Sequence, residues 1–92
     1  MTHSTFTFRV EGSFILVEDQ NVGMSVTNDA ENVIACLATK EFSLANRRVL
    51  YRDTEGRWDE LLVQDGRFAG FTAIGVTGTW IEAIAAAKRN GP

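Results

Sequence analysis

The sequence has very few of the residue types on which most enzyme sites depend. Its 92 residues include one histidine, one cysteine and one proline. The histidine, His3, lies in a terminal segment, and Cys36 has no histidine near it in the sequence that would activate its thiol. Nucleophilic catalysis needs a nucleophile within reach of a base. We therefore predict that the protein is not an enzyme and that Cys36 is a small core thiol.

Metal and phosphate motifs are equally scarce. One histidine and one cysteine cannot make a structural zinc site, and the carboxylates of Asp53, Glu55 and Asp59 lack the spacing of a calcium loop. Neither GxxxxGK[ST] nor GxGxxG occurs. Residues 75–78, GVTG, could present backbone N–H groups to an anion, although glycines are also needed there to turn the chain. We expect no metal and no cofactor.

The sequence also lacks a disulfide pair and a long apolar run. A single cysteine excludes an intramolecular disulfide, which is typical of a reducing compartment. No apolar run approaches the roughly 20 residues that span a bilayer. The start, MTHSTFTFRV, has no basic segment followed by an apolar one. We expect a cytoplasmic protein.

Neither sign of charge dominates, with 9 basic and 12 acidic residues and a net charge of -3. This balance argues against a surface adapted as a whole to nucleic acid, which needs many clustered cations. The arginines are nevertheless concentrated between residues 47 and 67 and alternate there with carboxylates. They indicate either cross-strand ion pairs on a solvated sheet or a contact surface, because arginine is enriched at binding hot spots.

Residues 47–75 predict a three-stranded meander. Two turn signals, Thr54-Glu55-Gly56 and Asp65-Gly66, separate three apolar runs. Asp-Gly favours a two-residue type I′ turn, which would place Val63 opposite Phe68, Leu62 opposite Ala69 and Glu60 opposite Phe71. A two-residue loop at Glu55-Gly56 would pair Asp53 with Trp58, Arg52 with Asp59, Tyr51 with Glu60 and Leu50 with Leu61. A three-residue loop with a bulge at Gly56 would shift the first strand by one residue.

With two-residue loops, alternation divides the meander into two faces. One is a core face on which Glu60 is the single misfit. Its other members are Val49, Tyr51, Trp58, Leu62, Ala69 and Phe71. The second face mixes apolar and charged side chains: Arg48, Leu50, Arg52, Asp59, Leu61, Val63 and Phe68.

The remaining segments predict a hairpin and two helices. Residues 5–10 and 14–17 flank Gly12-Ser13, which can form a II′-like turn that sets Phe8 opposite Val17 and Val10 opposite Ile15. Residues 24–27 could add a short strand. Capping boxes then predict helix starts at Asn28, answered by Glu31, and at Thr79, answered by Glu82. The apolar stripes of these helices are Ala30, Val33, Ile34, Leu37 and Ala38 in the first and Trp80, Ala83, Ile84 and Ala87 in the second.

These elements predict a single α+β domain over residues 1–92. We expect an antiparallel β-sheet, formed by the N-terminal hairpin and the three-stranded meander, with two α-helices packed on one face.

Three segments, VTNDAENVIACLA, RRVLYRDTEGRWDELL and GRFAGF, resemble parts of small accessory proteins of phages and plasmids. The size, acidity and α+β pattern of the chain also resemble anti-CRISPR proteins. The resemblance implies an inhibitor that binds a host RNA-guided interference complex, such as a CRISPR surveillance complex, and blocks target-DNA binding in the bacterial cytoplasm. Anti-CRISPR proteins share no common motif, so no functional residue is transferred.

Our leading hypothesis is therefore an interaction protein without catalytic activity. The candidate contact residues belong to the arginine-rich meander, and their arginines are also candidates for direct contact with RNA or DNA. They are Arg48, Arg52, Arg57, Asp59, Arg67 and Phe68. Two alternatives stay open: a small ligand-binding or catalytic domain with a pocket around Tyr51, Trp58 and Trp80, and a homodimer that buries the mixed face.

Overall fold

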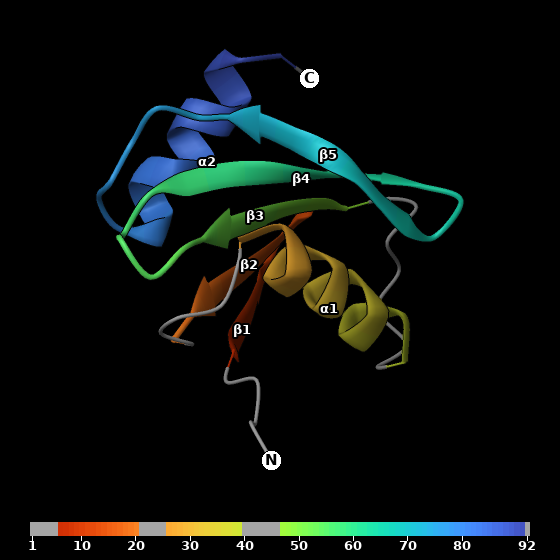
Figure 1. The fold of residues 1–92 in the computed structure, drawn as a ribbon. Helices are drawn as coiled ribbons and strands as arrows, with labels where there is room; N and C mark the ends of the chain where they lie inside the picture. The colour runs from red at the N-terminus through yellow and green to blue at the C-terminus, as the bar shows by residue number, and fades with distance from the viewer. Residues whose placement is uncertain (1–5, 21–25, 40–46, 92) are drawn as a thin grey trace.

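The computed structural model describes residues 6–20, 26–39 and 47–91 and shows an α+β fold (Figure 1). Five strands form one sheet in the order β1-β2-β3-β4-β5, accompanied by two helices. The elements along the chain are β1 (Phe6–Glu11), β2 (Phe14–Asp19), α1 (Val26–Thr39), β3 (Arg48–Arg52), β4 (Trp58–Gln64), β5 (Arg67–Ala73) and α2 (Trp80–Arg89).

The N-terminal hairpin forms with the predicted register. Phe8 lies opposite Val17 and Val10 opposite Ile15. Gly12 adopts a φ of 60°, the left-handed value that the first position of a II′ turn requires. The two-residue turn therefore fixes which side chains of β1 and β2 share a face.

The sheet is mixed, because β2 and β3 run parallel. We expected an entirely antiparallel sheet, and this expectation is wrong at that pair. α1 lies between β2 and β3 in the chain and returns it so that β3 starts at the same end of the sheet as β2. The helix begins at Val26, so the predicted start at Asn28 and the strand option for Val26 and Thr27 are also wrong. Residues 24 and 25 lie outside the described part.

The turn between β3 and β4 follows the alternative with the longer loop. Arg52 pairs with Trp58, one residue away from the register that a two-residue loop would give. The backbone N–H of Asp53 donates to the carbonyl of Arg57 at 3.0 Å, which leaves a three-residue loop. Its last residue, Gly56, has a φ of 86°. A one-residue slip moves every side chain of β4 to the other face relative to β3.

The turn between β4 and β5 is the predicted one, and the strands beyond it depart from the prediction. Asp65 and Gly66 have φ values of 54° and 76°, and Val63 lies opposite Phe68 as expected. The register then shifts between Leu62 and Val63, so Leu62 pairs with Gly70 rather than Ala69. The extra residue is a β-bulge, which also places Glu60 opposite Thr72 rather than Phe71.

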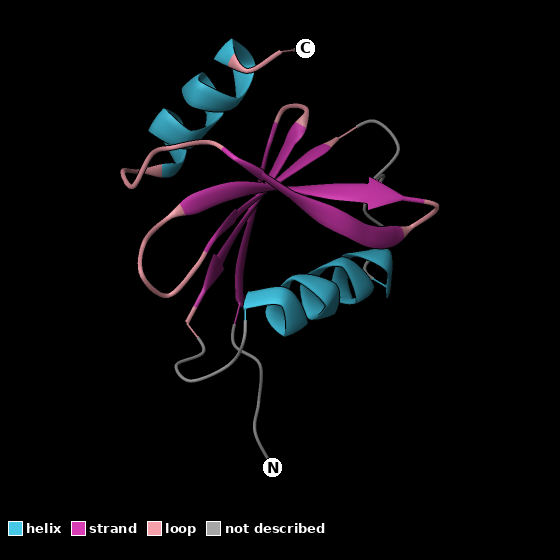
Figure 2. Cartoon of the chain, turned by 45° about the horizontal axis from the view of Figure 1, so that its top comes forward, coloured by secondary structure: helices cyan, strands magenta, loops and turns pink. Residues whose placement is uncertain are grey.

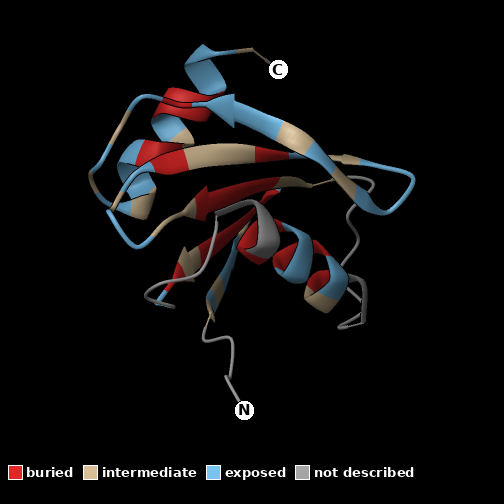
Figure 3. Ribbon diagram, viewed as in Figure 1, coloured by how far each residue is buried: buried red, intermediate tan, exposed pale blue. Residues whose placement is uncertain are grey.

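The two helices cover opposite faces of the sheet, which corrects the prediction that both pack on one face (Figure 2). Four residues of the α1 stripe, Ala30, Val33, Ile34 and Leu37, pack with Ile15, Val17, Val49, Tyr51 and Leu61. α2 packs with the alternate residues Phe14, Leu16, Leu50 and Trp58. The result is a three-layer arrangement in which the central strands are buried on both sides. Figure 3 shows this burial in β2 and β3 and the exposure of most of β5.

The observed register of β4 explains why Glu60 did not fit the predicted core face. Tyr51 and Val49 lie on the face that contacts α1, whereas Trp58 lies on the opposite face, against α2. Glu60 shares the α2 face with Trp58 and forms an ion pair with Arg48 there. Leu62, expected in the core, is 41% exposed.

α2 begins after Thr79, as predicted, but its capping box does not form. Thr79 occupies the N-cap position without a side-chain hydrogen bond to the helix. Ala83 and Ala87 of the predicted stripe are buried together with Ala86, while Trp80 and Ile84 are half-buried. The small side chains let the helix backbone lie close to the sheet.

Candidate interaction surface

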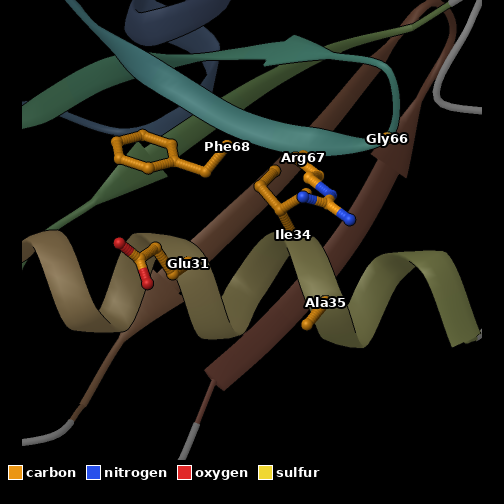
Figure 4. A pocket seen from close by; sticks show the side chains of 6 residues that line it. All are labelled: Glu31, Ile34, Ala35, Gly66, Arg67 and Phe68. Carbon is orange, nitrogen blue, oxygen red and sulfur yellow. The ribbon is translucent and has the colours of Figure 1, made fainter.

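An open cleft of about 280 Å³ lies between α1 and the β4–β5 hairpin. Phe68 supplies apolar surface beside the buried Ile34, while Glu31 and Arg67 contribute one charge of each sign (Figure 4). Ala35 also lines the cleft from α1. A cleft of this kind can accept an apolar side chain between flanking charges.

An aromatic pair extends this apolar surface along β5. The rings of Phe68 and Phe71 meet edge to face, with 4.9 Å between their centroids. Phe71 is 37% exposed although it is apolar, and Phe68 is half-buried. Aromatic side chains exposed beside a cleft are typical anchors at binding surfaces.

β5 is also an edge strand. In the part of the chain that the structure describes, β4 is its only partner, so the backbone groups along its outer side face away from the sheet. The bulge at Ala69 interrupts this edge, and such bulges limit unwanted pairing with the edge strands of other molecules. Residues 70–73 beyond the bulge stay regularly paired to β4. This short segment can accept an added strand from a partner.

Of the predicted contact residues, the cleft brings together Arg67 and Phe68. Sequence reasoning missed Glu31 and Ala35, because Glu31 was assigned to a capping box that depended on a helix start at Asn28. Sequence reasoning also placed Phe71 in the core, whereas its side chain is 37% exposed. The β-bulge that changes the register of β5 has no signal in the sequence other than Gly70. We define the hairpin surface as Glu31, Ala35, Arg67, Phe68 and Phe71.

Arg48 has an internal role. Its guanidinium donates two hydrogen bonds to the Glu60 carboxylate, at 3.0 and 2.6 Å. It also donates to the carbonyls of Gly91, at 2.8 Å, and Ala87, at 3.1 Å. These bonds to Glu60 raise the pKa of Arg48. The residue therefore ties the C-terminal end of α2 to the sheet.

Arg52 lies on the α2 face, away from the hairpin surface. It pairs with Glu18 of the neighbouring strand at 3.1 Å and lines a second hollow of about 310 Å³, which Trp80 and Glu82 also line. Both side chains of this ion pair are more than a third exposed, at 38% and 39%. Water screens such a pair, so it contributes little to stability.

Arg57 and Asp59 lie at the start of β4. Arg57 is exposed in the turn, and Asp59 is half-buried opposite Tyr51, in the second residue pair from the turn. Burial and the charge of Asp53 raise the pKa of Asp59, while Arg57 opposes this shift. The six predicted contact residues therefore do not form one continuous patch.

The alternative pocket around Tyr51, Trp58 and Trp80 does not form as one site. Tyr51 and Trp58 are 0% and 1% exposed and belong to core clusters on opposite faces of the sheet. Trp58 and Trp80 do share the second hollow, where the Trp58 indole N–H donates to the carbonyl of Gly78 at 2.8 Å. Trp80 is covered by the guanidinium of Arg9 at 4.6 Å.

The described residues contain neither a metal-binding cluster nor a membrane-spanning helix. No group of three or more His, Cys, Asp and Glu side chains there could hold a metal ion. No helix in the same part of the chain is long and apolar enough to cross a membrane. Cys36 is half-buried, and His3 lies outside the described residues.

Comparison of the chain with protein-family models, with curated proteins and with solved structures gave no match. The resemblance to phage-encoded inhibitors therefore stays a prediction.

Proposed function

We propose that the protein is an interaction module without catalytic activity that binds a partner protein through the hairpin surface. The observation that carries this proposal is the exposed aromatic pair beside a cleft on an edge strand. An extended segment of the partner adds to β5 along residues 70–73, and one of its apolar side chains enters the cleft. Backbone hydrogen bonds to β5 would supply affinity, and the cleft would supply specificity.

The exposed part of Phe71 sets the scale of its contribution. A phenylalanine presents about 200 Å², so a 37% exposed ring offers about 75 Å² to a partner, equivalent to about 2 kcal/mol. Loss of that contact corresponds to about a 30-fold rise in Kd. Phe71→Asp adds a charge that would be desolvated at the interface, so we expect at least this loss.

The charge of the surface favours a protein over a nucleic acid. Arg67 is the only basic member of the hairpin surface, and the acidic Glu31 lines the same cleft. Phosphate backbones are bound by several clustered cations. A net charge of -3 instead suits a partner with a basic surface.

The narrower proposal is that this partner belongs to an RNA-guided interference complex of a bacterial host, in the cytoplasm, and that binding blocks capture of target DNA. It is supported by the sequence resemblance and by the suitability of an acidic protein for the basic surfaces of nucleic-acid-binding machines.

The test uses purified interference complexes of different types and measures target-DNA binding by gel shift with increasing amounts of the protein. We expect inhibition of at least one complex, a loss of about 30-fold or more in potency for Phe71→Asp, and unchanged potency for Ile81→Asp. Ile81 is the matched control because it is 62% exposed on α2, on the opposite face.

Three results would count against the proposals. If every complex still binds target DNA in the presence of the protein, the narrower proposal is wrong. If Phe71→Asp and Ile81→Asp lose potency equally, the hairpin surface is not the binding site. Equilibrium sedimentation that shows a dimer dissociated by Phe71→Asp would make this surface a contact between copies of the chain.

A further inference from the structure

A hydrogen-bonded pair of carboxyl groups is buried between the first turn of α1 and the sheet. Asp29 of α1 is 1% exposed, and Asp19 at the end of β2 is 6% exposed. The side chains of the two residues hydrogen-bond to each other. The hydroxyl of Tyr51, which is fully buried on β3, donates to Asp19 Oδ2.

This arrangement requires a proton. Ionised carboxylates only accept hydrogen bonds, so two of them can bond directly only when one carries a proton. Asp29 Oδ1 is buried and accepts no hydrogen bond from a donor among the described residues. A bare carbonyl oxygen of a neutral acid costs less in the interior than a bare carboxylate. Asp29 is therefore the protonated member.

Among the described residues, the groups whose charge shifts the pKa of Asp29 or Tyr51 are all carboxyl groups. The charged groups that act on Tyr51 are Asp19, Asp29 and Asp53, and each raises its pKa. β4 contributes Asp59, whose cationic neighbour is Arg57. β1 places the neutral Phe6 opposite Asp19. Burial, the hydrogen bond with Asp19 and the charge of Asp19 raise the pKa of Asp29 to about 7.

We propose that Asp19 and Asp29 share one proton in the folded protein and that this proton holds the first turn of α1 against the sheet. When the proton leaves, two like charges face each other in the core and the helix start is loosened. Because Glu31, two residues from Asp29, lines the cleft, proton release would also alter the hairpin surface, a consequence that rests on the proposed function.

The sign of the pH dependence follows from proton linkage. The pKa of Asp29 is 3.8 in its ordinary state and about 7 in the folded protein. Between these values only the folded state holds the proton, so stability falls as pH rises. The folding equilibrium constant decreases by about tenfold per pH unit for one linked proton. Above the folded pKa both states have released it, and the dependence ends.

The experiment is urea denaturation of the wild type, Asp29→Asn and Glu55→Gln at pH 4.5 to 8.5, followed by tryptophan fluorescence. Asparagine keeps a donor toward Asp19 and has no charge to release. We expect the folding constant of the wild type to fall about tenfold per pH unit relative to Asp29→Asn until pH is near 7. Glu55→Gln, in an exposed turn, should follow the wild type. Parallel profiles of the wild type and Asp29→Asn would overturn the proposal.

A second measurement needs no variant. Carbon-13 NMR of the aspartate carboxyl groups in the wild-type protein should show one buried group that titrates near pH 7. If every aspartate has titrated by about pH 5, as ordinary carboxyl groups do, the shared proton does not exist. Both experiments omit the partner, so their failure would leave the proposed binding function standing.

Discussion

Arg48, which its ion pair with Glu60 holds in place, should be a principal anchor of the C-terminal end of α2. Replacement of Arg48 by methionine keeps an unbranched apolar stem beside the ring of Phe14, over which the guanidinium now lies at 5.5 Å. The change removes the two bonds to Glu60 and those to the carbonyls of Ala87 and Gly91. It therefore separates the polar contacts of Arg48 from its packing.

The magnitude follows from burial. The Arg48 and Glu60 side chains are 25% and 15% exposed, so part of each charge is removed from water. Loss of one partner of a fully buried pair costs about 3–5 kcal/mol, and a single charged hydrogen bond contributes about 1.5–3 kcal/mol. With the remaining access of water taken into account, we expect Arg48→Met to cost about 2–3 kcal/mol.

The assay is urea unfolding of Arg48→Met, Glu60→Gln and the double variant at pH 7. Because the residues interact directly, the two losses should not add, and the coupling should be about 1.5 kcal/mol or more. The surface pair is the control: Arg52→Met should cost less than about 1 kcal/mol. Equal costs for the Arg48 and Arg52 variants, or additive losses in the double variant, would refute the anchoring role.

Two further predictions concern turns and packing. Gly56→Ala should destabilise the protein by about 1–2 kcal/mol in the same assay, because Gly56 has a φ of 86° and a Cβ there would lie 3.3 Å from Arg52 Nη2; an unchanged midpoint would contradict this. Trp58→Phe should cost about 2–3 kcal/mol, since it leaves a void in the core and removes the donor to the carbonyl of Gly78. A loss below about 0.5 kcal/mol would show that this side chain is not a core residue.

Local signals were sufficient for the hairpins and for much of the helical pattern. Glycine at position 12 and Asp65-Gly66 specify tight turns by their backbone preferences, and both turns form. The stripe Ala30, Val33, Ile34 and Leu37 is buried, because helical periodicity depends only on spacing within one segment.

The layer arrangement and the β4 register depend on contacts between distant segments. Residues 14–17 and 49–51 are apolar without alternation and are buried on both faces, a pattern typical of a central strand with a layer on each side. The prediction of two helices on one face rests instead on the single apolar stripe of each helix, which does not indicate which face of the sheet the helix covers. At Gly56, two-residue and three-residue loops are both compatible with the sequence, and the one-residue difference exchanges the faces.

The candidate surface could be predicted only in part for the same reason. Arg67 and Phe68 follow a turn whose geometry the sequence specifies. Their place at the start of the last strand of the meander could therefore be predicted from the sequence. Arg48 and Arg52 are neighbours of carboxylates on adjacent strands, Glu60 and Glu18, and these pairs exist only once the register is known.

The central claim is that the hairpin surface contacts a partner protein, and site-specific photo-crosslinking tests it most directly. A photoreactive phenylalanine analogue would replace Phe71 in one protein and Ile81 in another, each mixed with the purified interference complex that the wild type inhibits. We predict a covalent product from position 71 and none from position 81. Crosslinking from position 81 alone would place the contact on α2 and contradict the account.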